Sequence, residues 1–207
     1  MHADDDKRLI QELVDNWAIS SDSGNWARFA ECWHDDGFMC ATWFQAPCAD
    51  FIAARRKGFD NGVSIIHFHG GFSCDVAASR AVSQTKMTIS QRAPVAGVLV
   101  DVTCTGRFYD FHEKRAGRWG MVRRQPIYEK DRMDAVDPEA RLVLDKNLLQ
   151  QFPEGYRHLA YLQTMIGYKV AKGGLPGIRG AEVEKLYADG AAWLAGATTP
   201  GRPDLIL

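Results

Sequence analysis

The fold is decided between residues 65 and 130, where the sequence reads IIHFHGGFSCDVAASRAVSQTKMTISQRAPVAGVLVDVTCTGRFYDFHEKRAGRWGMVRRQPIYEK. This stretch contains four segments rich in β-branched and aromatic residues, separated by short breaks that contain Ala together with Gly, Pro or Ser. Such segments are typical of strands, and breaks of this length join neighbouring antiparallel strands. We therefore predict four consecutive strands, over residues 65–76, 80–92, 98–112 and 118–130.

Helical patterns come before these strands. Apolar side chains recur every three or four positions over residues 7–19, and the same spacing returns over residues 26–33. A short strand is predicted over residues 38–43, and a third helix, capped by Asp50, over residues 50–59. Helices followed by adjacent strands predict an α+β domain in which a strongly curved, mostly antiparallel sheet wraps over the N-terminal helices and encloses a pocket.

The pattern becomes helical again after the last predicted strand. Candidate helices cover residues 137–150, 153–172 and 180–195, with Pro and Gly between them. We therefore divide the chain into a pocket domain, residues 7–134, and a helical C-terminal extension, residues 135–207.

This extension carries too many aromatic and aliphatic side chains to be a free, solvated appendage. It is predicted to pack on the core or on a partner subunit. Part of residues 152–168 would line or close the pocket, and the remainder would support a homo-oligomer, a dimer or a trimer. The alternative is a structural brace against the outer face of the sheet.

Composition excludes several classes of function. The 25 basic and 26 acidic residues give a net charge of -1, which provides no general attraction for nucleic acid. The five scattered cysteines form no CxxC pair, so reduced thiols and a cytoplasmic location are expected. No apolar run is long enough to span a membrane, and the polar first residues lack the apolar stretch of a secretory signal. No functional role is expected for residues 1–6.

Three stretches carry a resemblance to a known family. They read IQELVDNWAISSDSGNWARFAECWHDDG, then IIHFHGGFSCDV, then GRFYDFHEKRAGRWGMVRR. In order and spacing they resemble the SnoaL-like branch of the nuclear transport factor 2-like superfamily, which includes scytalone dehydratase, hexachlorocyclohexane dehydrochlorinase and bile-acid 7-alpha dehydratase. The resemblance covers about residues 9–130 and implies a cone-shaped α+β barrel.

The resemblance also implies two catalytic residues, Asp22 and His67. In that family an aspartate just after the first helix holds a histidine at the start of the first long strand, and the histidine removes a proton. Neutral imidazole titrates near neutral pH, and a carboxylate on its other nitrogen fixes the tautomer and stabilises the imidazolium. The sequence alone leaves simpler roles open, since Asp22 could cap a turn and His67 could be a hydrogen-bonded strand residue.

His69 lies two residues after His67, so both rings would point to the same face of a regular strand. The pair could supply two ligands to zinc or iron, with a third from Asp22, Asp75 or Cys104. A contact between His69 and the substrate needs no third ligand, and we expect that role for His69. We expect neither a metal nor a cofactor.

Further pocket residues follow from strand alternation. Met39 and Trp43 share one face of the short strand, and Arg123 and Gln125 share one face of the last strand. We predict that all four contact the substrate, although a bulge would reverse the face and Arg123 could be a solvated strand end. Trp17 is also expected in the pocket, at a position where the bile-acid dehydratase-like members have tyrosine.

The basic run over residues 55–57 is interpreted as a solvated helix face. Together these patterns predict a cofactor-independent lyase that eliminates water, or a small fragment such as formaldehyde or halide, from an apolar, aromatic or polycyclic small molecule. The alternatives are an isomerase or cyclase with the same base, and a non-catalytic module that binds small molecules.

Overall fold

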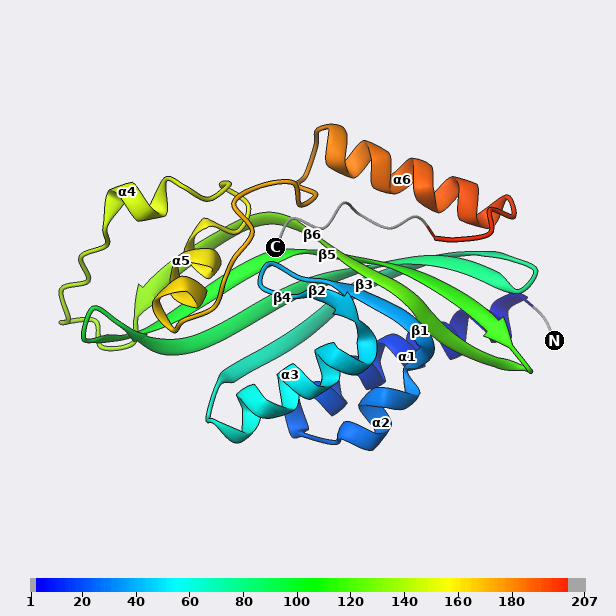
Figure 1. The fold of residues 1–207 in the computed structure, drawn as a ribbon, viewed down its shortest axis with the longest axis horizontal. Helices are drawn as coiled ribbons and strands as arrows, with labels where there is room; N and C mark the ends of the chain where they lie inside the picture. The colour runs from blue at the N-terminus through cyan, green and yellow to red at the C-terminus, as the bar shows by residue number, and fades with distance from the viewer. Residues whose placement is uncertain (1–2, 201–207) are drawn as a thin grey trace.

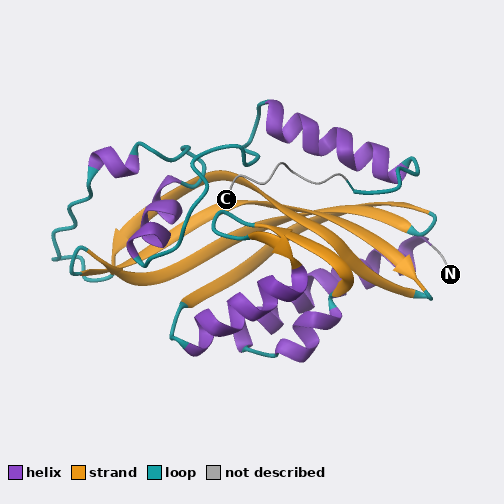
Figure 2. Ribbon diagram, viewed as in Figure 1, coloured by secondary structure: helices purple, strands orange, loops and turns teal. Residues whose placement is uncertain are grey.

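The computed structural model describes residues 3–200. The helices are α1 Ala3–Ser23, α2 Trp26–Glu31, α3 Cys48–Asp60, α4 Lys146–Leu149, α5 Arg157–Met165 and α6 Ala181–Leu194. A long, twisted sheet forms the centre of the molecule, with α1, α2 and α3 gathered on one side of it (Figure 1). Figure 2 shows α6 lying along the opposite side.

The sheet has six strands: β1 Trp33–Cys40, β2 Gln45–Pro47, β3 Ser64–Ala77, β4 Arg80–Val95, β5 Val98–Arg115 and β6 Arg118–Ala135. They lie in the order β2-β1-β6-β5-β4-β3, and β1 runs parallel to β6 while the other pairs are antiparallel. The predicted α+β fold, with N-terminal helices, a mostly antiparallel sheet and C-terminal helices, is confirmed. All four predicted long strands are present, and each extends beyond its predicted limits.

Tight turns explain why the long strands pair with their neighbours in sequence. At Ala96-Gly97 and at Ala116-Gly117 both residues have positive φ, between 48° and 83°. Two residues with positive φ form the hairpin turn whose twist matches that of the flanking strands. β4 therefore continues through residues 93–95, which the sequence had indicated as part of a loop.

A bulge changes which face of the sheet the side chains of β6 point to. Phe111 pairs with Arg123 and His112 pairs with Met121, so Val122 is an extra residue with no partner on β5. An extra residue of this kind reverses the alternation of side chains beyond it. Met121 belongs to the core beneath the sheet, whereas Val122 packs in a cluster on the other side.

Two of the apolar clusters join the helices to the two faces of the sheet. The larger one joins the N-terminal helices to the inner face of the sheet and includes Trp17, Phe29 and Phe108. The smaller one lies under α6 and includes Phe111 and Trp193. Each of these large side chains is almost fully buried, and burial of each contributes on the order of 1.5–3 kcal/mol.

The N-terminal region differs from the prediction in three places. Helix α1 begins before residue 7, and the buried Asp6 accepts hydrogen bonds from Lys114 Nζ at 2.7 Å and Trp119 Nε1 at 2.8 Å. Trp33, predicted at the end of a helix, begins β1. The N-cap of α3 is Pro47, with no side-chain cap, so the capping role predicted for Asp50 is wrong.

The C-terminal helices are shorter than predicted. Residues 137–145 contain no helix, because the Asp137 carboxylate accepts from the backbone N–H of Glu139 and holds a local turn. Helix α5 ends at Met165, and Gly167 follows with a φ of 94° that a continuing helix excludes. Helix α5 contacts β4, β5 and β6, whereas α6 packs beside β4.

The five cysteines are all buried and carry free thiols. Burial raises the pKa of Cys32 and of Cys40 to about 11, so both are protonated at neutral pH. Neither thiol is therefore activated as a nucleophile. Over residues 3–200, no helix combines the length and the apolar character that crossing a membrane requires.

A fully buried ion pair lies in the core. Arg124 donates to the Asp110 carboxylate through Nε at 2.8 Å and Nη2 at 2.7 Å, and neither side chain is exposed. The guanidinium also lies 4.0 Å from the ring centroid of Trp17 and 4.1 Å from that of Phe108. This pair therefore ties β5 and β6 to α1 beneath the sheet.

We predict that Asp110→Ala lowers the free energy of unfolding by about 3–5 kcal/mol, because it leaves Arg124 charged and buried without its partner. Urea denaturation followed by circular dichroism measures the change. The matched control is Asp101→Ala, which removes the partner of the exposed Arg92 and should change stability little. Equal effects of the two substitutions would contradict the prediction.

Candidate active site

The side chains of Asp22 and His67 meet beneath the sheet. Asp22 Oδ1 lies 2.7 Å from His67 Nδ1, and Asp22 Oδ2 accepts from the backbone N–H of His67 at 2.6 Å. Asp22 lies in the last turn of α1, because that helix continues to Ser23, beyond the helical pattern over residues 7–19. The carboxylate therefore fixes both the ring and the backbone of His67.

This contact determines which nitrogen of His67 can act as a base. A carboxylate accepts hydrogen bonds, so the Asp22 contact favours a proton on Nδ1 and a lone pair on Nε2. Within residues 3–200 no side chain or backbone group forms a hydrogen bond with Nε2. Burial lowers the pKa of His67, although Asp22 opposes this shift. The ring is therefore neutral at neutral pH and can accept a proton at Nε2.

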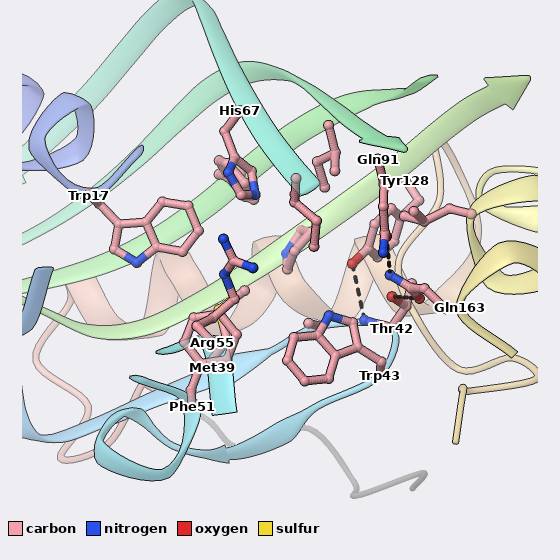
Figure 3. Close-up of a pocket in the computed structure, with 16 residues that line it drawn as sticks. Trp17, Met39, Thr42, Trp43, Phe51, Arg55, His67, Gln91, Tyr128 and Gln163 are labelled. Carbon is pink, nitrogen blue, oxygen red and sulfur yellow. Dashed lines mark hydrogen bonds between the residues drawn. The ribbon is translucent and has the colours of Figure 1, made fainter. Parts of the chain in front are cut away.

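His67 lies at the wall of a narrow, mostly apolar cavity (Figure 3). The cavity has a volume of about 40 Å³, which is room for a few water molecules. Trp43 lies on the short loop between β1 and β2 and is only partly buried, so its movement would enlarge this space. The lining residues are Trp17, Met39, Ala41, Thr42, Trp43, Phe51, Arg55, Ile65, His67, Ile89, Gln91, Phe108, Pro126, Tyr128, Leu159 and Gln163.

Arg55 is a pocket residue that the sequence interpretation missed. Only 4% of it is exposed, and its guanidinium donates to Ser21 Oγ from Nε at 3.3 Å and from Nη2 at 3.2 Å. Burial lowers the pKa of Arg55, and the nearby Asp22 opposes this shift. The interpretation of residues 55–57 as a solvated face is therefore wrong for Arg55. Its spacing of four from the buried Phe51 was the available signal.

His69 has a different environment from His67. Its Nδ1 lies 3.3 Å from Asp15 Oδ1, its ring packs against Phe108, and it does not line the cavity. Burial lowers the pKa of His69 to about 4. In the described part of the chain, no three residues of the His, Cys, Asp or Glu types are grouped as a metal site requires. The third ligand of the metal alternative is therefore not found there.

Arg123 and Gln125 do not line the cavity. Arg123 lies against Phe111, and its Nη1 donates to Asp189 at 3.3 Å on the side of α6. Gln125 is buried and donates to the backbone oxygen of Cys40 at 3.4 Å. The facing predicted for both residues is wrong, because the bulge at Val122 turns the following odd-numbered positions away from the pocket.

The remaining predicted pocket residues do line the cavity. Trp17, Met39 and Trp43 all contribute to the wall. Leu159 and Gln163 of α5 also contribute, so the expectation that part of residues 152–168 lines the pocket is confirmed. Figure 3 shows Gln163 beside Thr42, and sequence patterns gave no indication of this polar contact.

The chain is similar in sequence to a known domain family and to fungal proteins. The family model described as a SnoaL-like domain matches residues 4–125. A PEP2-like protein of Fusarium vanettenii is 36% identical over 198 residues, which cover 90% of this chain and 84% of that protein. Pea pathogenicity protein 2 of the same fungus is 38% identical over 165 residues, covering 78% of this chain and 71% of the relative.

Solved structures show the same fold at low sequence identity. A putative scytalone dehydratase from Novosphingobium aromaticivorans has a TM-score of 0.52 and 18% identity, covering 66% of this chain and 94% of that one. A hexachlorocyclohexane dehydrochlorinase has a TM-score of 0.52 and 14% identity, covering 67% of this chain and 95% of that one.

The hydrogen bond to Asp22 predicts a measurable change in the titration of His67. In the wild-type protein, the pKa of His67 should lie below its ordinary value of 6.5. Asp22→Asn removes the group that raises this pKa, so the pKa should fall further. NMR of histidine labelled in the ring measures both values.

The control is Asp15→Asn, which removes the carboxylate beside His69 and should leave the titration of His67 nearly unchanged. A His67 that titrates above pH 6.5 in the wild type, or that does not respond to Asp22→Asn, would contradict this prediction.

Proposed function

The chain belongs to the SnoaL-like domain family, and on that premise we propose that it is a cofactor-independent lyase with His67 as general base. The observation that carries the proposal is the Asp22–His67 pair, with His67 Nε2 at an apolar cavity and without a hydrogen-bond partner among residues 3–200. The substrate is a small apolar or aromatic molecule. We also propose that the protein forms a homo-oligomer, a dimer or a trimer.

In this reaction, His67 Nε2 removes a proton from a carbon atom of the substrate. The electrons of the C–H bond form a carbon-carbon double bond, and the neighbouring leaving group departs with its own bonding electrons. Asp22 stabilises the imidazolium that forms. The imidazolium then returns its proton to a leaving hydroxide, which releases water and restores the neutral base.

Two other groups of the cavity support this step. The Arg55 guanidinium lies with Ser21 and Asp22 at the His67 end, where its charge stabilises negative charge that develops on the substrate. Trp17 Nε1 is buried without a hydrogen-bond partner among the described residues, so it can donate to a departing oxygen or halide. A substrate ring enters by displacing the partly exposed Trp43.

The test begins with a panel of aromatic and alicyclic alcohols, assayed by mass spectrometry for loss of water, and of haloalkanes assayed for loss of halide. On the best substrate, His67→Ala should lower kcat/KM about 100- to 10,000-fold, and Asp22→Asn should be nearly as damaging. Because burial lowers the pKa of His67, the base stays neutral below pH 6.5, and the wild-type rate should persist there.

His158→Ala is the matched control. His158 forms a similar pair with Asp131, at 2.8 Å, but it is not part of the cavity wall. This variant should keep most of the activity. A His67→Ala protein that retains more than about a tenth of the wild-type rate would exclude the proposed base.

We also predict that prolonged chelation leaves the activity unchanged, because the described residues provide no three-ligand group around His67 and His69. Elemental analysis of the purified protein should show no stoichiometric zinc or iron. Activity that is lost on chelation and regained when one of these metals returns would instead assign the two histidines to a metal.

A further inference from the structure

A chain of hydrogen bonds crosses the end of the cavity away from His67. Thr42 Oγ1 donates to Gln163 Oε1 at 2.7 Å, and Gln163 Nε2 donates to Gln91 Oε1 at 3.4 Å. All three residues are buried and line the cavity. Gln91 takes part in this chain through its Oε1 atom, so its Nε2 group is left outside the chain.

Two donors at this end are left to bind something else. Gln91 Nε2 is buried and has no hydrogen-bond partner within residues 3–200. The Tyr128 hydroxyl accepts from the backbone N–H of Thr42 at 3.2 Å, and its own proton is available to donate. Burial raises the pKa of Tyr128, so the hydroxyl keeps that proton at neutral pH. A buried donor without a partner is costly, and a ligand oxygen would satisfy it.

Strand register gives the separation between these donors and the proposed base. In the β3–β4 ladder His67 pairs with Ile89, and Ile65 pairs with Gln91. Two residues along a strand correspond to about 7 Å. Figure 3 shows Gln91 and Tyr128 grouped away from His67. The span between the two ends is therefore that of a small ring with one substituent.

The charge of the wall limits the kind of oxygen that fits. Arg55 is the one cationic side chain among the described lining residues, and it lies with Ser21 and Asp22 at the His67 end. A carboxylate beside Gln91 would be buried without a cation, which is costly. A neutral carbonyl oxygen accepts two hydrogen bonds at much lower cost.

We infer that Gln91 and Tyr128 form a subsite for a neutral carbonyl oxygen of the ligand. Gln163 of α5 orients the Gln91 side chain through its hydrogen bond to Gln91 Oε1. This inference rests on the proposed function only in taking the cavity as the substrate site. Tyr128 and Gln163 lie beyond residue 125, where the family match ends. Of the two, Gln163 belongs to the C-terminal extension, which therefore contributes to specificity as well as covering the core.

The test compares three probes of similar shape: acetophenone, isopropylbenzene and benzoate. Binding is followed by NMR of the wild-type protein, including the side-chain amide signals of Gln91 and Gln163. Acetophenone should bind at least about tenfold more tightly than isopropylbenzene, and benzoate more weakly than acetophenone. Acetophenone should also shift the Gln91 amide signals.

Three variants assign the effect. Gln91→Leu and Tyr128→Phe should each weaken acetophenone binding about tenfold, with isopropylbenzene changed less than about threefold. Gln163→Leu should weaken acetophenone selectively, because Gln91 is then free to rotate. Gln84→Leu, on the outer face of the same strand as Gln91, is the matched control and should leave the preference unchanged. Melting temperatures check that each variant is folded.

Equal binding of acetophenone and isopropylbenzene, no measurable acetophenone binding, or tighter binding of benzoate would each overturn the inference. So would a Gln91→Leu variant that weakens both neutral probes alike. The preference should survive in His67→Asn. In the wild-type protein, a preserved preference without any elimination activity on the substrate panel would reject the lyase and keep the subsite, whereas elimination without the preference would reject the subsite and keep the lyase.

Discussion

One carboxylate, that of Asp22, joins the end of α1 to the first long strand and also holds the ring that faces the cavity. One of its oxygens bonds the His67 ring and the other bonds the His67 backbone. Neither the helix end nor the ring can therefore turn without the loss of a charge-assisted hydrogen bond. The docking of α1 and the tautomer of the candidate base depend on the same group, so the fold positions the chemistry with no additional element.

Buried charges determine how strong a base this ring can be. Burial lowers the pKa of His67, and the positive charges of Arg55 and Arg124 act in the same direction. Asp22 alone acts strongly against them. The balance keeps the imidazole neutral, while the adjacent carboxylate stabilises the cation that forms after proton transfer. Arg124 is itself neutralised by Asp110, which limits how far it can lower that pKa.

Sequence patterns predicted the long strands, because strands depend on local periodicity, whereas the pairing of Asp22 with His67 was implied only by the resemblance to a known family. They did not predict which face of the sheet Arg123 and Gln125 lie on. The extra residue Val122 reverses the alternation of side chains, and no residue type in the sequence indicates such a bulge. Arg55 was misread because a basic run suggests solvent, although its helical position places it inside.

The hydrogen bond between Thr42 and Gln163 joins residues separated by 121 positions along the chain. During synthesis the N-terminal helices and the strands leave the ribosome first, whereas α5 follows the whole sheet. The amide that fixes Gln91 is therefore the last part of the cavity wall to be made. A chain that has been synthesised only as far as β6 lacks one side of the cavity wall, so the complete cavity forms only after α5 has been made.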